Sequence, residues 1–550
     1  MIWDPPVDLV PVLTFLDRFS WVFSFQWIDP NEESAEVQGL QSAMEKIPTH
    51  WVEPLTCATF GNLKALILGL EDNYTWPQDL RQFASECRRF TAIVSQNVCL
   101  LPTMFSQPTL MYNPSANCVD FLPNKRVPNA KQLLHITSKK SHEVARMTAF
   151  LRHLLCNRNL DCDEDAFSDR STGTFQTSPL LSLRKCQTKH GIYPSCVVDI
   201  GSGLGHLPNL LAQCLVQETD TNAESFPFRV CAVDCDPVLD QKARLMLQRP
   251  DRIGVEKRSH VWSQTIRRLL FCLTESNTMG FTSLLNESLN PEVVSSHSNW
   301  KQTSTYLLSG LHCCGDLSHS VTQLFEDDVR AEWVVLVGCC YHKMTLKQFP
   351  TSDRLRVAFK SVPNLMRSFC SKATFRLACQ WSPCIWLSWT DRDCNVHRVR
   401  LISRILSPAG TRKFDPIKNC PELHSVLDLP GLDFNRVLSM IPQISCPSKR
   451  MPYLTAVWNL SPGLLALQQL LQPLLEIIIL ADRVWRLRTD RSRKPKHMFT
   501  GLVRLFDPKI SPRCMALVAC KSWLSTIADA HNCNLTEPNW NSGPSHSICH

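Results

Sequence analysis

The residues that most clearly suggest chemistry in this 550-residue chain are an acid followed by three glycines at alternating positions. Asp199 stands two residues before Gly201, and Gly203 and Gly205 follow. Glycine has no Cβ, so such a turn can be tight and a ligand can approach the main-chain N–H groups closely. The chain has only 18 glycines against 36 prolines, so three alternating glycines stand out from the background.

The elements on either side of the glycines predict how they are positioned. Residues 197–200 form a short apolar run typical of a buried strand, and 207–216 have the apolar periodicity of a helix. A strand, a glycine turn and a helix are how an open α/β sheet presents N–H groups to a nucleotide-like ligand. The spacing differs from the dinucleotide G-x-G-x-x-G pattern, and the lysine of a phosphate-binding P-loop is missing. A glycine-rich turn without a ligand is the alternative.

A second acid follows the next predicted strand. Residues 228–233 are apolar and lead into Asp234, with Asp236 two residues later. An acid at this strand end is where the ribose of a nucleoside can be hydrogen-bonded. Asp234 is therefore the predicted ribose ligand, and Asp236 is the second choice.

Histidine, cysteine and acid clusters follow two further predicted strands, 305–311 and 333–337. In a doubly wound sheet, chemistry takes place outside the carboxyl ends of the strands, which is where both clusters fall. An imidazole can accept a proton near neutral pH, so a histidine there could act as a general base. We predict that the reacting group is surrounded by these residues, with His312 or His342 as the base: His312, Asp316, Tyr341 and His342.

The same two clusters also contain the ligand types that zinc prefers. The candidates are His312, Cys313, Cys314, Cys339, Cys340 and His342. However, the cysteines occur as adjacent pairs rather than as C-x-x-C, and buried thiols are frequent in ordinary cores. We therefore assign no metal ligands and keep zinc as the alternative.

A basic stretch at a predicted helix start is a candidate substrate-binding site. Lys139, Lys140 and His142 precede a helix that we expect to run through Leu155, with Ser141 as its cap. Positive side chains at a helix N-terminus can hold a phosphate or carboxylate group. A solvated helix start is the alternative.

Composition places the chain among globular proteins, because 44% of its residues are hydrophobic. The net charge of +8 permits an anionic partner such as RNA without requiring one. The chain has 26 cysteines and opens without the pattern of an export signal, which favours an intracellular location, cytoplasmic or nuclear. Residues 464–481 are the nearest approach to a membrane span, but glutamines, a proline and a glutamate interrupt them, so a buried helix is favoured.

The predicted architecture is an α/β doubly wound sheet with a large insertion before its last strands. We divide the chain into a helical N-terminal region, the sheet core, a mainly helical insertion, the closing strands of the core and a disordered tail: 1–130, 131–350, 351–497, 498–525 and 526–550. Residues 102–128 predict a linker, 160–190 a flexible insertion and 274–303 a loop.

The insertion is predicted to end in a long helix over 461–487, bent at Pro473. Basic residues gather at its end: Arg483, Arg486, Arg488, Arg491, Arg493, Lys494 and Lys496. They could bind RNA phosphates, although a solvated helix face is the more frequent explanation of such a run.

Several of these stretches, in this order, resemble one family. The matching stretches are Trp76-Pro77, 138–144, 199–207, 311–317, 338–343, 473–476, Asp482-Arg483 and 506–508. They resemble the methyltransferase-like protein 25 group, whose close relative is called ribosomal RNA adenine dimethylase domain-containing protein, and the likeness runs from about residue 50 to 520. Residues 137–138 depart from it, because a proline expected there is missing.

This resemblance implies a class I, Rossmann-like methyltransferase that uses S-adenosyl-L-methionine as its cofactor. Asp199 would then face the positively charged methionine end, and the glycines would flank the adenosine. The cofactor-binding residues that it implies are Asp199, Gly201, Ser202, Gly203, Gly205, His206 and Asp234.

The methyl acceptor is less well defined by the sequence. The Asp/Asn-Pro-Pro-Tyr/Phe motif of adenine-N6 methyltransferases is missing after the fourth predicted strand, where His312 to Gly315 stand instead. The Leu-His-x-Cys-Gly and Cys-Cys-x-His pieces are similar to those of eukaryotic tRNA ribose methyltransferases. We therefore expect RNA, at a ribose or a base, as the acceptor. A protein side chain is one alternative, and a non-catalytic cofactor-binding or interaction protein on this fold is another.

Overall fold

The structure is a computed structural model. It describes residues 7–25, 35–99, 136–155, 194, 196–218, 229–248, 265–289, 305–345, 349–406, 415–441, 451–489 and 499–521. The predicted linker at 102–128, insertion at 160–190 and tail at 526–550 lie outside these residues.

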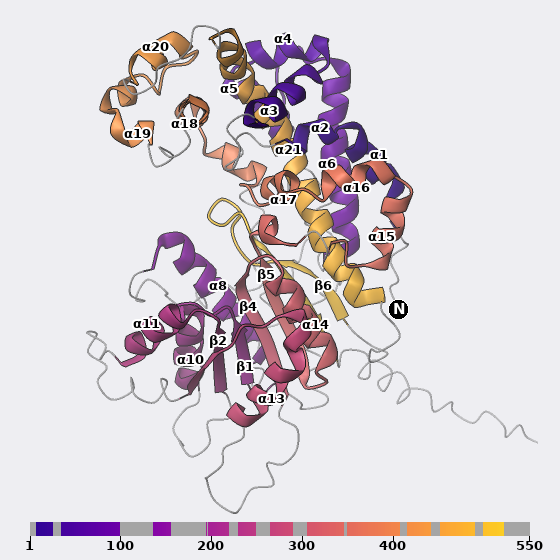
Figure 1. Ribbon diagram of the computed structural model, residues 1–550, viewed down its shortest axis with the longest axis vertical. Coiled ribbons are helices and arrows are strands. Elements are labelled where there is room, and N and C mark those ends of the chain that lie inside the picture. Colours follow the sequence, from indigo (N-terminus) through magenta and orange to yellow (C-terminus); the bar gives the residue numbers. More distant parts are fainter. Residues whose placement is uncertain are drawn as a thin grey trace, which may run out of the picture.

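A seven-stranded sheet forms the centre of one half of the molecule (Figure 1). Its strands are β1 (Cys196–Ile200), β2 (Arg229–Asp234), β3 (Ile266–Leu270), β4 (Tyr306–Cys313), β5 (Ala331–Gly338), β6 (Phe499–Arg504) and β7 (Met515–Cys520). They lie in the order β3-β2-β1-β4-β5-β7-β6, and only the pairings of β7 with β5 and β6 are antiparallel. The order reverses between β1 and β4, which is the switch point where open α/β sheets bind ligands. The fold is that of a class I methyltransferase, as predicted.

Side chains alternate between two cores because successive residues of a strand point to opposite faces. On one face, Val197 and Leu307 pack with α8 (Ser138–Leu155) and α10 (His206–Glu218). On the other, Val198 and Leu308 pack in the core that includes α13 (Thr278–Leu289) and α14 (Leu317–Asp327). The central strands are therefore buried on both faces, which explains why their sequences are continuously apolar.

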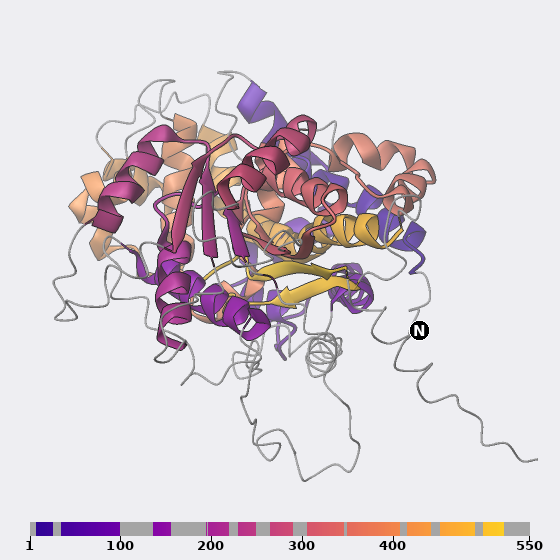
Figure 2. The same ribbon diagram turned by 90° about the horizontal axis from the view of Figure 1, so that it is seen from below.

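The other half of the molecule is helical and is organised around the long helix α21 (Met451–Thr489) (Figures 1 and 2). The helices of the N-terminal region lie in this half: α1 (Val10–Arg18), α2 (Ser20–Phe23), α3 (Ala35–Glu45), α4 (Thr49–Cys57), α5 (Phe60–Leu68) and α6 (Gln78–Val98). Helices α2, α4, α5 and α6 pack against α21, and α1 packs against two helices of the insertion. Helices of the insertion join them: α15 (Asp353–Lys360), α16 (Pro363–Phe369), α17 (Lys372–Ala378), α18 (Asp391–Leu406), α19 (Pro416–Asn419) and α20 (Phe434–Ser439). The predicted N-terminal region and the predicted insertion thus share one core.

Helix α21 begins ten residues before the predicted start at Ser461 and continues through Pro462 and Pro473. Among the described residues it is the one helix long and apolar enough to cross a membrane, yet 89% of its most apolar stretch is buried inside the protein. The helices around it cover this apolar surface, so α21 has the surroundings of a core helix.

Two local predictions are wrong. Residues 278–289 form α13 rather than a loop, because Thr274 and Asn277 make a capping box and Phe281 and Leu285 are buried one turn apart. Helix α8 begins at Ser138 rather than after Ser141. The hydroxyl of Thr137 accepts the N–H of Lys140 at 3.3 Å, so Thr137 caps this helix.

Candidate active site

The glycine turn after β1 is held against β2. The N–H groups of Gly201 and Ser202 both donate to the carbonyl of Val233, at 2.9 and 3.0 Å. Gly201, Gly203 and Gly205 have φ angles of 72°, 54° and 79°, in the left-handed region that side chains disfavour. The turn therefore requires glycine at all three positions. Glycine there also fits the predicted close approach of a ligand to the main chain.

Asp234, at the end of β2, is fixed beside this turn. Its Oδ2 accepts the N–H of Gly203 at 2.6 Å and its Oδ1 accepts the N–H of Asp236 at 2.9 Å. The carboxylate of Asp236 instead accepts the N–H groups of Val238 and Leu239, at 2.8 and 3.2 Å, at the start of α11 (Pro237–Gln248). Asp236 is therefore a helix cap, whereas Asp234 is held against the glycine turn at the strand end.

An arginine that the sequence analysis missed braces the turn from β3. Arg268 donates from Nη2 to the carbonyl of Gly203 at 3.0 Å and from Nε to Oδ1 of Asp240 at 2.8 Å. Its side chain is 2% exposed. A Cβ added to Gly205 would lie 2.8 Å from Nη1 of Arg268, so the arginine and the glycine are packed together. The sequence signal is weak, because the arginine lies in a short strand beyond a stretch without a clear pattern.

Asp199 is the buried acid of the site. It is 3% exposed, and the hydroxyl of Ser309 donates to its Oδ1 at 3.3 Å. Burial raises the pKa of Asp199 from 3.8 to about 7, and it outweighs the opposing attraction of Lys140 and the bond from Ser309. The positive charges around Asp199 are therefore too weak to compensate its ionised carboxylate. A cationic ligand would supply the missing positive charge.

The buried Glu143 and the partly exposed His312 form an acid–imidazole pair between α8 and the end of β4. Oε2 of Glu143 lies 3.1 Å from Nε2 of His312, and Oε1 accepts the hydroxyl of Ser511 at 2.7 Å. Although burial opposes ionisation, the hydrogen bond and charge of His312, the bond from Ser511 and the charge of Lys139 hold the pKa of Glu143 below its usual value. Glu143 matched the family motif but was not assigned to the site, because an acid near a helix start is ordinarily explained by the helix dipole.

The three predicted substrate-binding residues of α8 are not equivalent. Lys140 is half-buried, burial lowers its pKa, and it interacts electrostatically with both Glu143 and Asp199. Lys139 is exposed and lies 3.8 Å from Glu143. His142 points to the segment between β6 and β7, where its Nε2 accepts the N–H of Asp507 at 3.1 Å. Only Lys140 therefore connects the turn with the strand ends.

Two of the predicted site residues, Tyr341 and Asp316, are held by contacts within the protein. Tyr341 is 1% exposed, and its hydroxyl lies 3.3 Å from Oε1 of Glu476 on α21. The ring of Tyr341 is therefore packed in the core between the sheet and the helices. Asp316 is also structural: its Oδ1 accepts the N–H of Thr345 at 2.9 Å. His342 is partly exposed, and its buried Nδ1 has no partner among the described residues.

Three of the six predicted zinc ligands lie together. The Sγ atoms of Cys314, Cys339 and Cys340 are within 4.8 Å of one another, and Cys314 and Cys339 are 2.9 Å apart. The hydrogen bond from Cys339, aided by Cys340 and Lys343, lowers the pKa of Cys314 to about 6. His312 instead faces Glu143 through its Nε2, and the thiol of Cys313 is buried against the carbonyl of Ile200. The geometry therefore supports the zinc hypothesis for Cys314, Cys339 and Cys340.

The basic end of α21 is occupied by contacts within the protein. Arg486 lies 2.9 Å from Glu326, Arg488 donates to the carbonyls of Asn97 and Thr500, and Arg483 is 7% exposed. Arg483 is buried and Arg486 is half-buried, whereas Arg488 keeps an exposed surface although its guanidinium donates to two carbonyls. The remaining basic residues of the run, 491–496, lie outside the described residues.

Comparison with known proteins agrees with the fold and the turn. Residues 139–347 match the family model of a methyltransferase domain. This stretch is therefore similar to a methyltransferase domain, and the sheet order is that of the class I type. No solved structure gives a significant match.

Two curated relatives carry the same name, "Probable methyltransferase-like protein 25". The mouse protein is 27% identical over 236 residues, covering 39% of this chain and 37% of the relative. The human protein is 25% identical over 246 residues, covering 41% of this chain and 38% of the relative. The match thus spans less than two fifths of each relative's length. It confirms the predicted resemblance to the methyltransferase-like protein 25 group, while the ribosomal RNA adenine dimethylase name stays a prediction.

Proposed function

We propose that this protein is an S-adenosylmethionine-dependent methyltransferase that acts on RNA. The observation that carries the proposal is the cradle at the switch point of the sheet, where the glycine turn lies between two acids. Asp234 is bonded to the N–H of Gly203, and Asp199 is buried without full charge compensation.

The residues of this cradle fit the cofactor. The three glycines leave room where side chains would otherwise stand, and Asp234 lies at the strand end suited to ribose hydroxyls. The cationic methionine end would compensate Asp199, whose raised pKa reports an unfavourable negative charge. When bound, S-adenosylmethionine supplies a methyl group activated by its positive sulfur.

Methyl transfer is a displacement in line with the breaking bond, so the protein must align the acceptor and remove its proton. His312 is the best placed base. Because Glu143 is held in its ionised form, Nε2 of His312 must donate to it, which leaves Nδ1 to accept a proton from a hydroxyl or amide. Glu143 is then a positioning residue, and Lys140 is a candidate contact for the acceptor.

RNA is favoured as the acceptor by the net charge of +8. The test is transfer of a labelled methyl group from S-adenosylmethionine to total RNA and to total protein in parallel. Label in RNA supports the proposal. Label in protein alone would show that the acceptor is a protein and not RNA. Calorimetry that shows cofactor binding without transfer to either fraction would instead favour a non-catalytic protein.

A further inference from the structure

Three thiols that the proposed reaction does not use lie together at the ends of β4 and β5. Cys314 follows β4, and Cys339 and Cys340 follow β5. The Sγ atoms of Cys314 and Cys339 are 2.9 Å apart, whereas those of Cys339 and Cys340 are 3.7 Å apart. Two sulfurs that bind one tetrahedral zinc ion lie about 3.8 Å apart. Although the three sulfurs could share a metal ion, the short contact is that of a hydrogen-bonded pair of thiols.

The backbone brings this pair within reach of a disulfide. Cys313 of β4 is paired with Gly338 of β5, and Cys314 and Cys339 come directly after these two residues. Neighbouring strands lie about 4.8 Å apart, and a disulfide spans Cα separations of about 4.4–6.8 Å. The two sulfurs need to approach by only about 0.9 Å to reach the S–S bond length of about 2.0 Å. A disulfide could therefore form with little movement of either strand.

Contacts that involve no sulfur hold the two segments together. Oδ1 of Asp316 accepts the N–H of Thr345 at 2.9 Å. A Cβ added to Gly315, the residue after Cys314, would lie 2.8 Å from the carbonyl oxygen of Lys343. The segments that follow β4 and β5 are therefore in direct contact beyond the thiols, and the fold itself keeps the thiols paired.

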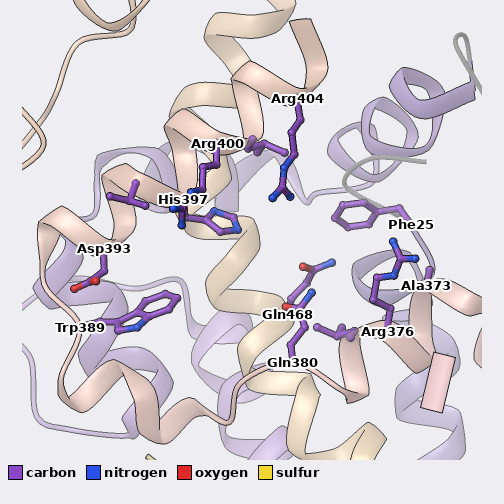
Figure 3. Close-up of a pocket in the computed structure, with 13 residues that line it drawn as sticks. Phe25, Ala373, Arg376, Gln380, Trp389, Asp393, His397, Arg400, Arg404 and Gln468 are labelled. Carbon is purple, nitrogen blue, oxygen red and sulfur yellow. The ribbon is translucent and has the colours of Figure 1, made fainter. Parts of the chain in front are cut away.

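A fourth thiol, that of Cys379, belongs to the scaffold of this cluster. Its Sγ accepts the N–H of Tyr341 at 2.9 Å and donates to the carbonyl of Cys339 at 3.7 Å. The next residue, Gln380, lines a cavity of about 410 Å³ between α17 and α18 (Figure 3). Residues 379–380 thus lie between the thiols and this cavity, and the sulfur of Cys379 anchors the backbone that carries Cys339.

The two paired thiols differ in their access to solvent. Cys314 is partly exposed, and Cys339 is 8% exposed. The hydrogen bond from Cys339 stabilises the thiolate of Cys314, which is the form that attacks a peroxide. A small oxidant that arrives from solvent therefore meets Cys314 first, with Cys339 behind it.

We propose that Cys314 and Cys339 form a redox site that takes a hydroperoxide and closes a disulfide. The thiolate sulfur of Cys314 attacks one peroxide oxygen, so that an S–O bond forms, the O–O bond breaks and hydroxide leaves. The sulfur of Cys339 then attacks that of Cys314, so that the S–S bond forms, the S–O bond breaks and a second hydroxide leaves. The two thiol protons convert both hydroxides to water. The two cysteines thus lose two electrons, which reduce hydrogen peroxide to two water molecules.

The disulfide would also act on the candidate active site. Cys314 is two residues after His312, and an S–S bond would fix the ends of β4 and β5 to each other. Methyl transfer should therefore fall in the oxidised protein and recover with a dithiol reductant. This effect rests on the proposed function, whereas formation of the disulfide does not.

The test maps the disulfides of the full chain after treatment with hydrogen peroxide. Remaining thiols are blocked with iodoacetamide, and the protein is digested without reduction for mass spectrometry. The variants are Cys314→Ser and Cys339→Ala. Cys340→Ser is the matched control, because this thiol is in the same cluster but outside the short contact. Dimedone, which traps sulfenic acids, thermal unfolding and elemental analysis for zinc accompany each protein.

We expect a peptide cross-linked through Cys314 and Cys339 in the wild type and in Cys340→Ser, and its loss in the other two variants. Cys339→Ala should leave the sulfenic acid of Cys314 open to dimedone, whereas the wild type should resolve it. Methyl transfer by the oxidised wild type should fall by about tenfold, since a displacement of about 1 Å is costly in a catalytic site. Cys314→Ser should keep its activity in peroxide.

The proposal would be overturned if peroxide oxidised the exposed Cys57 and Cys272 while no cross-link joined Cys314 to Cys339. Bound zinc, with thiols that react only after chelation, or a cross-link from Cys314 to Cys340 would also overturn it. A cross-link in a protein without methyl transfer would leave the redox site assigned and the proposed function wrong. An active methyltransferase without the cross-link would do the reverse.

Discussion

Glu143 and His312 meet 3.1 Å apart although 169 positions separate them in the chain. One comes from the helix that precedes the sheet and the other from the carboxyl end of β4, so the pair exists only in the assembled domain. The carboxylate fixes which ring nitrogen carries the proton, and this connects the fold directly to the proposed base.

Removing this base should abolish methyl transfer while the cofactor still binds. We expect His312→Ala to lower kcat by about 10²- to 10⁴-fold, the usual contribution of a general base. Glu143→Gln should give a smaller loss and shift the pH–rate profile, because the ring would lose its orienting charge. Full turnover in His312→Ala would contradict the assignment.

A matched control for this experiment is His50→Ala. Its Nε2 lies 2.8 Å from Asp79, so it has the same acid–imidazole contact on the helical half of the molecule. It should keep the wild-type rate. His342→Ala, measured in parallel, tests the second histidine that the sequence offered as a base.

Asp199 should make cofactor binding depend on pH. Its pKa in the folded protein is about 7, so the carboxylate becomes neutral below this pH and no longer attracts a cation. We expect the affinity for S-adenosylmethionine, measured by calorimetry, to fall by up to about tenfold per pH unit below 7. Asp199→Asn should bind weakly at every pH and lose this dependence.

The carboxyl of Asp199 should also make the free energy of unfolding depend on pH. The direction should be opposite to that of an acid paired with a base. The folded pKa of about 7 lies above the unfolded value near 3.8, so the folded state binds the extra proton between these values. The contribution of Asp199 to stability therefore falls as pH rises through this window. In chemical denaturation, the free energy of unfolding should fall less between pH 5 and 8 for Asp199→Asn than for the wild type. An identical pH dependence in the two proteins would contradict the raised pKa of Asp199.

The glycine turn should be sensitive at Gly205. Gly205→Ala places a Cβ 2.8 Å from Arg268 in a backbone with φ of 79°, which costs about 1–3 kcal/mol in strain. We expect cofactor affinity to fall at least tenfold. Gly280→Ala is the control, because Gly280 is in helix α13 and has no atom within 4 Å of an added Cβ. Equal cofactor affinity in the two variants would show that the turn does not hold the cofactor.

Strands β1, β2, β4 and β5 could be predicted from sequence because they are short apolar runs that lead into glycine, acid or histidine, whereas β3 was not predicted because Arg267 and Arg268 interrupt its apolar pattern. Asp199 and Gly201 to Gly205 were found because they are close in the chain. Glu143 and Arg268 were missed because each reaches the site from a distant element, where the residue type alone suggests a helix end or an exposed strand. The burial of Tyr341 could not be predicted for the converse reason: an aromatic hydroxyl near a strand end carries no sign that α21 will bury it.

Cys314 should be an unusually reactive thiol. The hydrogen bond from Cys339 lowers its pKa to about 6, and the thiolate is the reactive form. We expect iodoacetamide at pH 7 to label Cys314 before the exposed Cys57 and Cys272, as read by mass spectrometry. Labelling that appears only after a chelator, together with zinc by elemental analysis, would support the metal alternative instead. Cys57 or Cys272 reacting first would contradict the lowered pKa.

The most direct measurement is transfer of the labelled methyl group from S-adenosylmethionine to total RNA, compared with total protein, by the wild type and by His312→Ala. The account predicts label in RNA with the wild type and its loss in the variant, with cofactor binding retained in both. Wild-type protein that binds the cofactor but labels neither fraction, or a His312→Ala variant that labels RNA at the wild-type rate, would contradict it.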